Sequence, residues 1–299
     1  MQGVNNNRDV QTKRLSSKVI FMMQLFTKVS GECSRVTTKS YSTSFSSAIQ
    51  FLHKDLQQHI YNIYGFVRFA DEIVDTFHDY DKTTLLAEFK QTTYEAIERK
   101  ISLNPILNSF QSTVNYYAID IKLIEAFFKS MELDLYKQQY NSTTYKEYIY
   151  GSAETVGLMC LFVFCEGDAN IYEHLKSYAR SLGAAFQKVN FLRDLKNDFE
   201  RLDRIYFPGF DVKNFTHFDK QKIEEDIQKD LDHAYKGIVQ IPAKAKFGVY
   251  VAYKYYLSLF KKIQRLQPRY VKTQRIRIPN YGKAFIIAKA GLRSQLNIL

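Results

Sequence analysis

The stretch from residue 64 to residue 75 reads YGFVRFADEIVD, and its pattern is that of a helix with one polar face. Side chains three or four positions apart lie on the same face of a helix, so Tyr64, Arg68, Asp71 and Asp75 form one polar stripe. The residues between them are mostly apolar, which is unusual for a helix face turned to solvent. An acidic pair at this spacing also occurs on solvated helices, so this stripe alone leaves both interpretations open.

A second stretch further along the chain repeats this design. Residues 187–198 read QKVNFLRDLKND, and the helical step places Gln187, Asn190, Asp194 and Asp198 on one face. A charged surface helix is the alternative. Mg²⁺ takes oxygen ligands and binds through one or two carboxylates together with substrate phosphates, whereas Zn²⁺ favours His and Cys. Two such helices facing each other across a cavity therefore predict a site for a magnesium-bound diphosphate.

A third stretch, residues 150–157, reads YGSAETVG and continues into the apolar run LMCLFVF. A helix that is apolar all round is buried. Each glycine costs about 1 kcal/mol of helix propensity relative to alanine, so its presence in a helix needs a reason. Either the backbone leaves room for a long hydrocarbon, or two helices pack closely. The pattern by itself favours close packing.

The rest of the chain has the same helical spacing. Pro105 is the only proline in the first 200 residues, and no alternation of strand and helix patterns appears, so we expect an all-α protein. We expect one domain over residues 23–299, preceded by a disordered extension over residues 1–22. Helices are predicted over Ile49–Thr76, Leu85–Leu103, Ile119–Tyr140, Tyr145–Phe164, Ile171–Leu202, Gln221–Val239 and Ala245–Leu266.

Composition excludes several classes of protein. The chain has 299 residues, 45% of them hydrophobic, which is ample for a packed core and excludes an intrinsically disordered protein. Its three cysteines form no CxxC pair, and no HExxH pattern occurs, which argues against a zinc hydrolase. The longest apolar run, Val156–Cys165, is shorter than the roughly 20 residues that a membrane-spanning helix needs. The polar N-terminus is not a secretory signal. These features predict a cytoplasmic protein and leave peripheral membrane contact open.

Positive charge is concentrated in the C-terminal quarter. After Asp232 there is no acidic residue, whereas 14 lysines and arginines follow. Such a segment predicts an anionic partner, namely nucleic acid, a lipid surface or a phosphorylated substrate. A solvated basic face is the simpler alternative. Because no nucleic-acid-binding module is recognisable, we expect no nucleic-acid partner.

Together with the upstream segment STSF (42–45), these three stretches resemble the squalene/phytoene synthase family of head-to-head prenyl synthases, and most of all its bacterial phytoene synthases. The resemblance extends from Thr38 to Lys283. It implies an isoprenoid synthase fold, an all-α bundle around a central apolar cavity. The sequence departs from the family pattern at Glu72, where many members have aspartate, and at Tyr41, where some have histidine.

The resemblance also implies roles for individual residues. Magnesium, or manganese in its place, would be bound by Asp71, Asp75, Asn190, Asp194 and Asp198. The prenyl diphosphates would contact Ser42, Ser44, Tyr64, Arg68, Gln187, Asn190, Arg193, Tyr256 and Arg275. The catalytic residues would be the four aspartates together with Tyr150, which would lie at the cavity near the reacting carbons. The basic tail, with Arg277 and Lys283, would close over the phosphates.

The reaction implied is the condensation of two prenyl diphosphates through a cyclopropyl intermediate. We expect two molecules of geranylgeranyl diphosphate to give phytoene, a step of carotenoid biosynthesis. NADPH is not expected, because no GxGxxG follows a strand pattern. Squalene or dehydrosqualene synthesis from farnesyl diphosphate is the alternative. A non-catalytic family member that acts as an assembly protein is another, and the intact acidic stripes disfavour it.

Overall fold

The computed structural model describes residues 3–136, 140–202, 206–209, 215–271 and 275–295, and within them it contains helices and no strands. Side chains are described for the same residues except 3–18, 196–202, 280 and 293–295. The prediction of an all-α fold is confirmed. The helices are α1 (Gly3–Tyr41), α2 (Thr43–Ile49), α3 (Lys54–Thr76), α4 (Lys82–Arg99), α5 (Pro105–Tyr117), α6 (Ile121–Leu133), α7 (Ser142–Ile149), η1 (Tyr150–Glu154), α8 (Thr155–Phe164), α9 (Ala169–Leu202), α10 (His217–Ile238), α11 (Ala243–Gln264), α12 (Pro268–Val271) and α13 (Asn280–Gln295).

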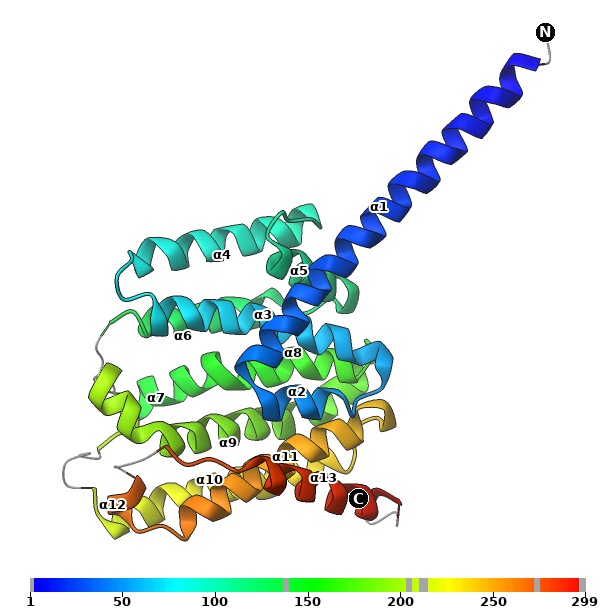
Figure 1. Cartoon of the computed structure of the whole chain (residues 1–299). Helices are drawn as coiled ribbons and strands as arrows, with labels where there is room; N and C mark the ends of the chain where they lie inside the picture. Colours follow the sequence, from blue (N-terminus) through cyan, green and yellow to red (C-terminus); the bar gives the residue numbers. More distant parts are fainter. Residues whose placement is uncertain (1–2, 137–139, 203–205, 210–214, 272–274, 296–299) are drawn as a thin grey trace.

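The helices lie in layers, from α4 and α6 on one side, through α8 and α9 in the middle, to α10, α11 and α13 on the other (Figure 1). The long helix α9 packs against α8, α10 and α11, and α3 packs against α8. Within the described part of the chain, no helix is both long enough and apolar enough to cross a bilayer. Helix α1 begins at Gly3 and its first half extends beyond the bundle (Figure 1). The expected division of the chain at residue 23 stays a prediction.

Several helix boundaries are set by short polar side chains that cap the first turn. Asn104 Oδ1 accepts hydrogen bonds from the backbone N–H groups of Ile106 (3.0 Å) and Leu107 (3.3 Å), and Pro105 stands at the first position of α5. Asn104 and Pro105, which directly follow the helix expected over Leu85–Leu103, therefore begin a further helix. Five helices, α1, α2, α5, α12 and α13, have no counterpart among the expected spans. The expected helix over residues 119–140 ends instead at Leu133.

The expected helix over residues 145–164 consists of three pieces, α7, the π-helix η1 and α8. The glycines of this region bring it close to α9, which runs antiparallel to α8. A Cβ on Gly183 would lie 2.6 Å from the carbonyl oxygen of Ala153, and one on Gly157 would lie 3.0 Å from that of Ala179. A real side chain does not fit at the first distance and would be tightly crowded at the second, so the prediction of close helix packing is confirmed.

Candidate functional site

An apolar cavity of about 450 Å³ lies at the centre of the bundle, between α2, α3, α8, α9, α10 and α11. Apolar side chains form most of its wall, among them the aliphatic residues Ile49, Val67, Leu161, Leu182, Ile238 and Val249. A cavity with this lining suits a hydrocarbon chain better than a polar ligand. The cavity expected from the sequence is therefore present.

The cavity has a charged end, which we call the mouth, and an aromatic far end. Arg68, Asp71 and Asn190 lie at the mouth, whereas Phe164 and Tyr178 lie at the far end. Tyr178 precedes Asn190 by twelve residues on α9, so their backbones are about 18 Å apart along the helix axis. A ligand with a charged head and a long apolar tail matches this polarity.

On the α3 side of the mouth, Arg68 is the central group. One of its terminal nitrogens, Nη1, lies 2.5 Å from Asp71 Oδ2, and the other hydrogen-bonds to Glu72 Oε2. Its guanidinium carbon also lies 4.4 Å above the ring of Tyr41. Burial raises the pKa of Glu72, but hydrogen bonds from Arg68, Thr76 and Tyr41 outweigh it and hold that pKa below the ordinary value of 4.5.

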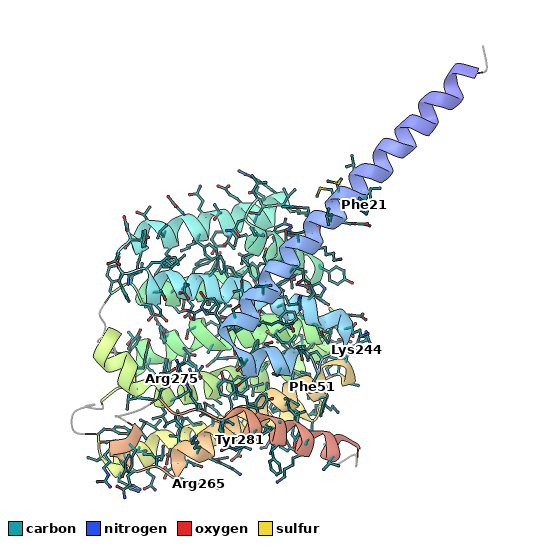
Figure 2. The ribbon with its side chains drawn as sticks, in the orientation of Figure 1. Phe21, Phe51, Lys244, Arg265, Arg275 and Tyr281 are labelled. Atoms are coloured by element: carbon teal, nitrogen blue, oxygen red, sulfur yellow. The ribbon has the colours of Figure 1, made fainter. Side chains whose placement is uncertain are left out.

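On the α9 side of the mouth, Asp194 is held by two arginines. Arg193 Nη2 lies 2.5 Å from Asp194 Oδ2, and Arg275 Nε lies 2.8 Å from Asp194 Oδ1. Arg275 comes from the segment before α13, so this pair joins the basic tail to α9 (Figure 2). One turn before Asp194, the side-chain oxygen of Asn190 is buried and has no hydrogen-bond partner among the described residues. An oxygen in this situation favours a cation or a donor from a ligand.

Neutral hydroxyl groups complete the mouth. Burial raises the pKa of Tyr64 to about 12, and the nearby Tyr256 adds to this rise, whereas Arg68 and Ser42 act in the opposite direction. Tyr64 therefore keeps its proton at neutral pH and can donate a hydrogen bond. Ser42 caps α2 by accepting the backbone N–H of Phe45 at 3.2 Å, which fixes its hydroxyl at the cavity wall.

A second hollow of about 560 Å³ adjoins the mouth and shares Ser42, Arg193 and Arg275 with the cavity. It is lined in addition by Ser44, Tyr255, Arg277 and Lys283. The ammonium group of Lys283 lies 2.6 Å from the hydroxyl of Thr43 and thereby ties α13 to α2. No acidic side chain is among the described residues that line this hollow, so it suits an anionic group.

The expected metal ligands are only partly brought together. Asp71 lines the cavity, Asp194 is ion-paired at the mouth, and Asp75 is half-buried one turn beyond Asp71 without lining the cavity. Asp198 lies on α9, and its side chain falls outside the described residues. Among the side chains that are described, no three His, Cys, Asp or Glu groups gather closely enough to hold a metal ion. Mg²⁺ does not need such a cage, because it binds through one or two carboxylates and substrate phosphates.

Most of the predicted substrate-binding residues do converge. The cavity is lined by Ser42, Tyr64, Arg68, Gln187, Asn190, Arg193, Tyr256 and Arg275, and Ser44 lines the adjoining hollow. Tyr150, which we expected at the cavity, is not among the residues that line it. Its ring lies 5.3 Å from the guanidinium carbon of Arg180, which is itself paired with Glu154 at 2.5 Å. The π-helix η1 turns the following residues, Ser152 and Ala153, to the cavity instead.

Two features of the site could not be predicted from the sequence. Tyr41 differs from the residue that some family members have at this position, and its ring covers Arg68. The far end of the cavity is lined by Phe164, Leu175 and Tyr178, from two helices whose register depends on glycine contacts. No sequence signal distinguishes these side chains from ordinary core residues.

Comparisons with known proteins identify the family and agree with the fold. The family model described as "Squalene/phytoene synthase" matches residues 38–282. The phytoene synthase of Arthrospira platensis is 28% identical over 293 residues, which cover 89% of this chain and 93% of that protein. The 4,4'-diapophytoene synthase of Staphylococcus haemolyticus is 26% identical over 201 residues, covering 64% of this chain and 67% of the relative. A crystal structure of a dehydrosqualene synthase in complex with ligand has a similar fold, with a TM-score of 0.76 at 19% identity, covering 91% of this chain and 98% of that one.

Proposed function

The chain belongs to the squalene/phytoene synthase family, and we propose that it joins two molecules of geranylgeranyl diphosphate head to head to give phytoene. The observation that carries this proposal is the mouth, where arginines and carboxylates stand at the entrance of an apolar cavity. The family makes isoprenoids, and relatives named phytoene synthases support the twenty-carbon substrate.

The arginines of the mouth are suited to bind diphosphate. The free-energy cost of burying the charges of a diphosphate without oppositely charged partners would be prohibitive. Arg68, Arg193 and Arg275 come from three separate segments and point at the same entrance. A guanidinium group binds phosphate oxygens through two parallel hydrogen bonds, which orients the head group as well as neutralising it. Arg277 and Lys283 offer further positive charge in the adjoining hollow.

We also propose that the site takes Mg²⁺, with Mn²⁺ as a substitute. Asp71, Asp75, Asn190, Asp194 and Asp198 would hold it together with diphosphate oxygens. The buried, unpartnered oxygen of Asn190 supports this assignment, since oxygen is the donor that Mg²⁺ prefers. When bound, the ion supplies Lewis-acid assistance to the departure of the diphosphate.

The walls near the mouth would protect the cation that this departure leaves. Tyr64, uncharged at neutral pH, can donate a hydrogen bond to a diphosphate oxygen. Phe186 and Tyr256 are stacked at 3.7 Å between ring centroids, and Phe45 stacks on Tyr64 at 5.2 Å. Such rings exclude water and stabilise an adjacent cation by about 0.5–2 kcal/mol each.

In the proposed reaction, C1 of one prenyl chain loses its diphosphate and is attacked by the double bond of the second chain, and loss of a proton then closes the cyclopropane ring. The cyclopropyl product, which still carries the second diphosphate, loses that diphosphate, rearranges and loses a second proton, and no NADPH is consumed. Dehydrosqualene synthesis from farnesyl diphosphate follows the same steps with shorter chains, and the diapophytoene synthase relative favours it as the second candidate. We propose a cytoplasmic enzyme in peripheral contact with a membrane, because its substrates and its product are lipid-like.

The test is incubation of the purified chain with either prenyl diphosphate, with and without NADPH, followed by extraction and product analysis. We expect phytoene from geranylgeranyl diphosphate, no dependence on NADPH, and loss of turnover when a chelator is added. Magnesium in excess over the chelator should restore turnover. If neither substrate yields a hydrocarbon product under any of these conditions, the protein is not a synthase, and the assembly role becomes the better explanation.

A further inference from the structure

The middle of α1 carries an exposed apolar segment, residues 19–29. Val19, Ile20, Phe21, Met22 and Met23 follow one another directly and are 46–63% exposed. Figure 2 shows Phe21 on the part of α1 that projects from the bundle, with no other ribbon beside it. Leu25 and Val29 continue the exposure to the point where the helix meets the bundle. Exposed apolar segments of this kind mark interaction sites.

The second half of α1 is attached quite differently. Ser30 and Ser34 are fully buried, and Ser30 Oγ accepts a hydrogen bond from Asn108 at 3.0 Å, while the hydroxyl of Ser34 lies 2.7 Å from that of Ser109. This polar, hydrogen-bonded contact fixes the helix on α3 and α5. The exposed apolar residues are therefore not needed to hold α1 in place, and they are free to contact something else.

The arrangement of apolar residues indicates what covers this segment. Five consecutive residues of a helix point in all directions around its axis, since each is turned by about 100° from the last. A protein partner that docked on one face would leave the other side chains in water. A lipid layer surrounds an inserted segment from every side.

The charges around the segment indicate which lipid. Residues 8–28 contain five lysines and arginines against one aspartate. A second copy of the same helix would bring these like charges together, whereas an anionic lipid surface attracts them. The segment is eleven residues long, about 16 Å as a helix, and so it is too short to cross a bilayer of about 30 Å.

We propose that residues 19–29 of α1 insert into the surface of an anionic lipid membrane and hold the bundle beside it. This interaction does not depend on catalysis, although a membrane would accept the hydrocarbon product of the proposed function. Binding is therefore measured with the full chain in the absence of any prenyl diphosphate, so that its failure is distinct from a failure of the proposed function.

The experiment is co-sedimentation with vesicles of phosphatidylcholine, with or without an equimolar share of phosphatidylglycerol. The double variant Ile20→Ser/Phe21→Ser removes two side chains of the exposed segment. The control Tyr80→Ser/Leu103→Ser removes two side chains that are at least as exposed, at 70% and 93%, on other parts of the molecule. We expect the partition coefficient of the test variant to fall about tenfold or more, and that of the control to stay unchanged.

Three results would overturn the proposal. The first two are equal binding of the test variant and the wild-type protein to vesicles, and equal binding of the wild-type protein to charged and uncharged vesicles. The third is a self-association of the wild-type protein that the test variant abolishes. Sedimentation velocity without lipid measures the last of these. Circular dichroism and turnover in detergent check that both variants are folded, and neither changes a residue of the mouth or the cavity.

Discussion

Asp194 is the residue whose replacement tests the site most directly. Its carboxylate lies 2.5 Å from Arg193 Nη2 and 2.8 Å from Arg275 Nε, and its side chain is 17% exposed. The substitution Asp194→Asn keeps the shape of the side chain and removes its charge. It weakens both ion pairs and deprives the mouth of one anionic oxygen. The sequence alone suggests that a solvated carboxylate can be lost without effect on stability, and the burial of Asp194 modifies that expectation.

The expected loss of stability follows from these contacts. A hydrogen bond to a charged group contributes about 1.5–3 kcal/mol, and the amide retains part of it while the partly exposed Arg275 rehydrates. We therefore expect a loss of about 1–2 kcal/mol and a melting temperature lower by about 2–6 °C. The effect on turnover is larger. If Asp194 binds the divalent cation, kcat/KM should fall at least about a hundredfold, because such ions contribute several kcal/mol to the transition state.

Thermal unfolding and steady-state kinetics of the same preparations measure the two effects. Asp230→Asn is the matched control, since Asp230 is paired with Lys188 of the same helix α9 at 2.7 Å and is 21% exposed, but does not line the cavity. The control should lose a similar amount of stability and keep its turnover. If Asp194→Asn remains as active as the unchanged chain, or if both variants lose activity equally, the role of Asp194 at the mouth is refuted.

Three further variants test other parts of the structure. Tyr178→Ala lengthens the far end of the cavity, so the preference for geranylgeranyl over farnesyl diphosphate should rise about tenfold in a competition assay; an unchanged ratio would contradict this. Gly183→Ala places a Cβ against a backbone oxygen and should cost about 1–3 kcal/mol in denaturant unfolding, and a variant of full stability would show that the helices can separate freely. The pKa of Glu72 is lower in the folded protein than its ordinary value of 4.5, so the ionised carboxylate stabilises the fold at pH values above 4.5. This stabilisation is lost as the pH falls through the folded-state pKa. Glu72→Gln should therefore flatten the acid limb of a stability–pH curve, and an unchanged limb would exclude that contribution.

The fold class follows from the sequence because helical periodicity is a local property. It predicts α3, α9, α10 and α11, whose apolar faces pack on the core. It fails at α5, because the Asn104–Pro105 pair is equally typical of a loop and of a capped helix start. It fails again at the attached half of α1, where serine and threonine replace the apolar residues that usually mark a buried face.

The site follows from the sequence only as far as spacing along one helix allows. The four-residue step correctly groups Tyr64 with Arg68 and Asn190 with Asp194, because each pair shares a helix. It cannot show that Asp194 pairs with Arg275, which is distant in the sequence. Nor can it place Tyr150, because a π-helix begins at this residue and the regular helical step does not continue through it.

The pairing of charges at the mouth leads to a last prediction. Arg68 has Asp71 as a partner, and Arg193 and Arg275 share Asp194, so a diphosphate must compete with these carboxylates for the arginines. A divalent cation held by the carboxylates would release the arginines, and each ligand should then strengthen the binding of the other. We expect inorganic pyrophosphate to bind about 5–150-fold more tightly with Mg²⁺ than without it, the usual range for coupled sites. Calorimetric titration measures both affinities, and Asp194→Asn should reduce their ratio. Equal affinities with and without Mg²⁺ would mean that the arginines and the carboxylates do not exchange partners.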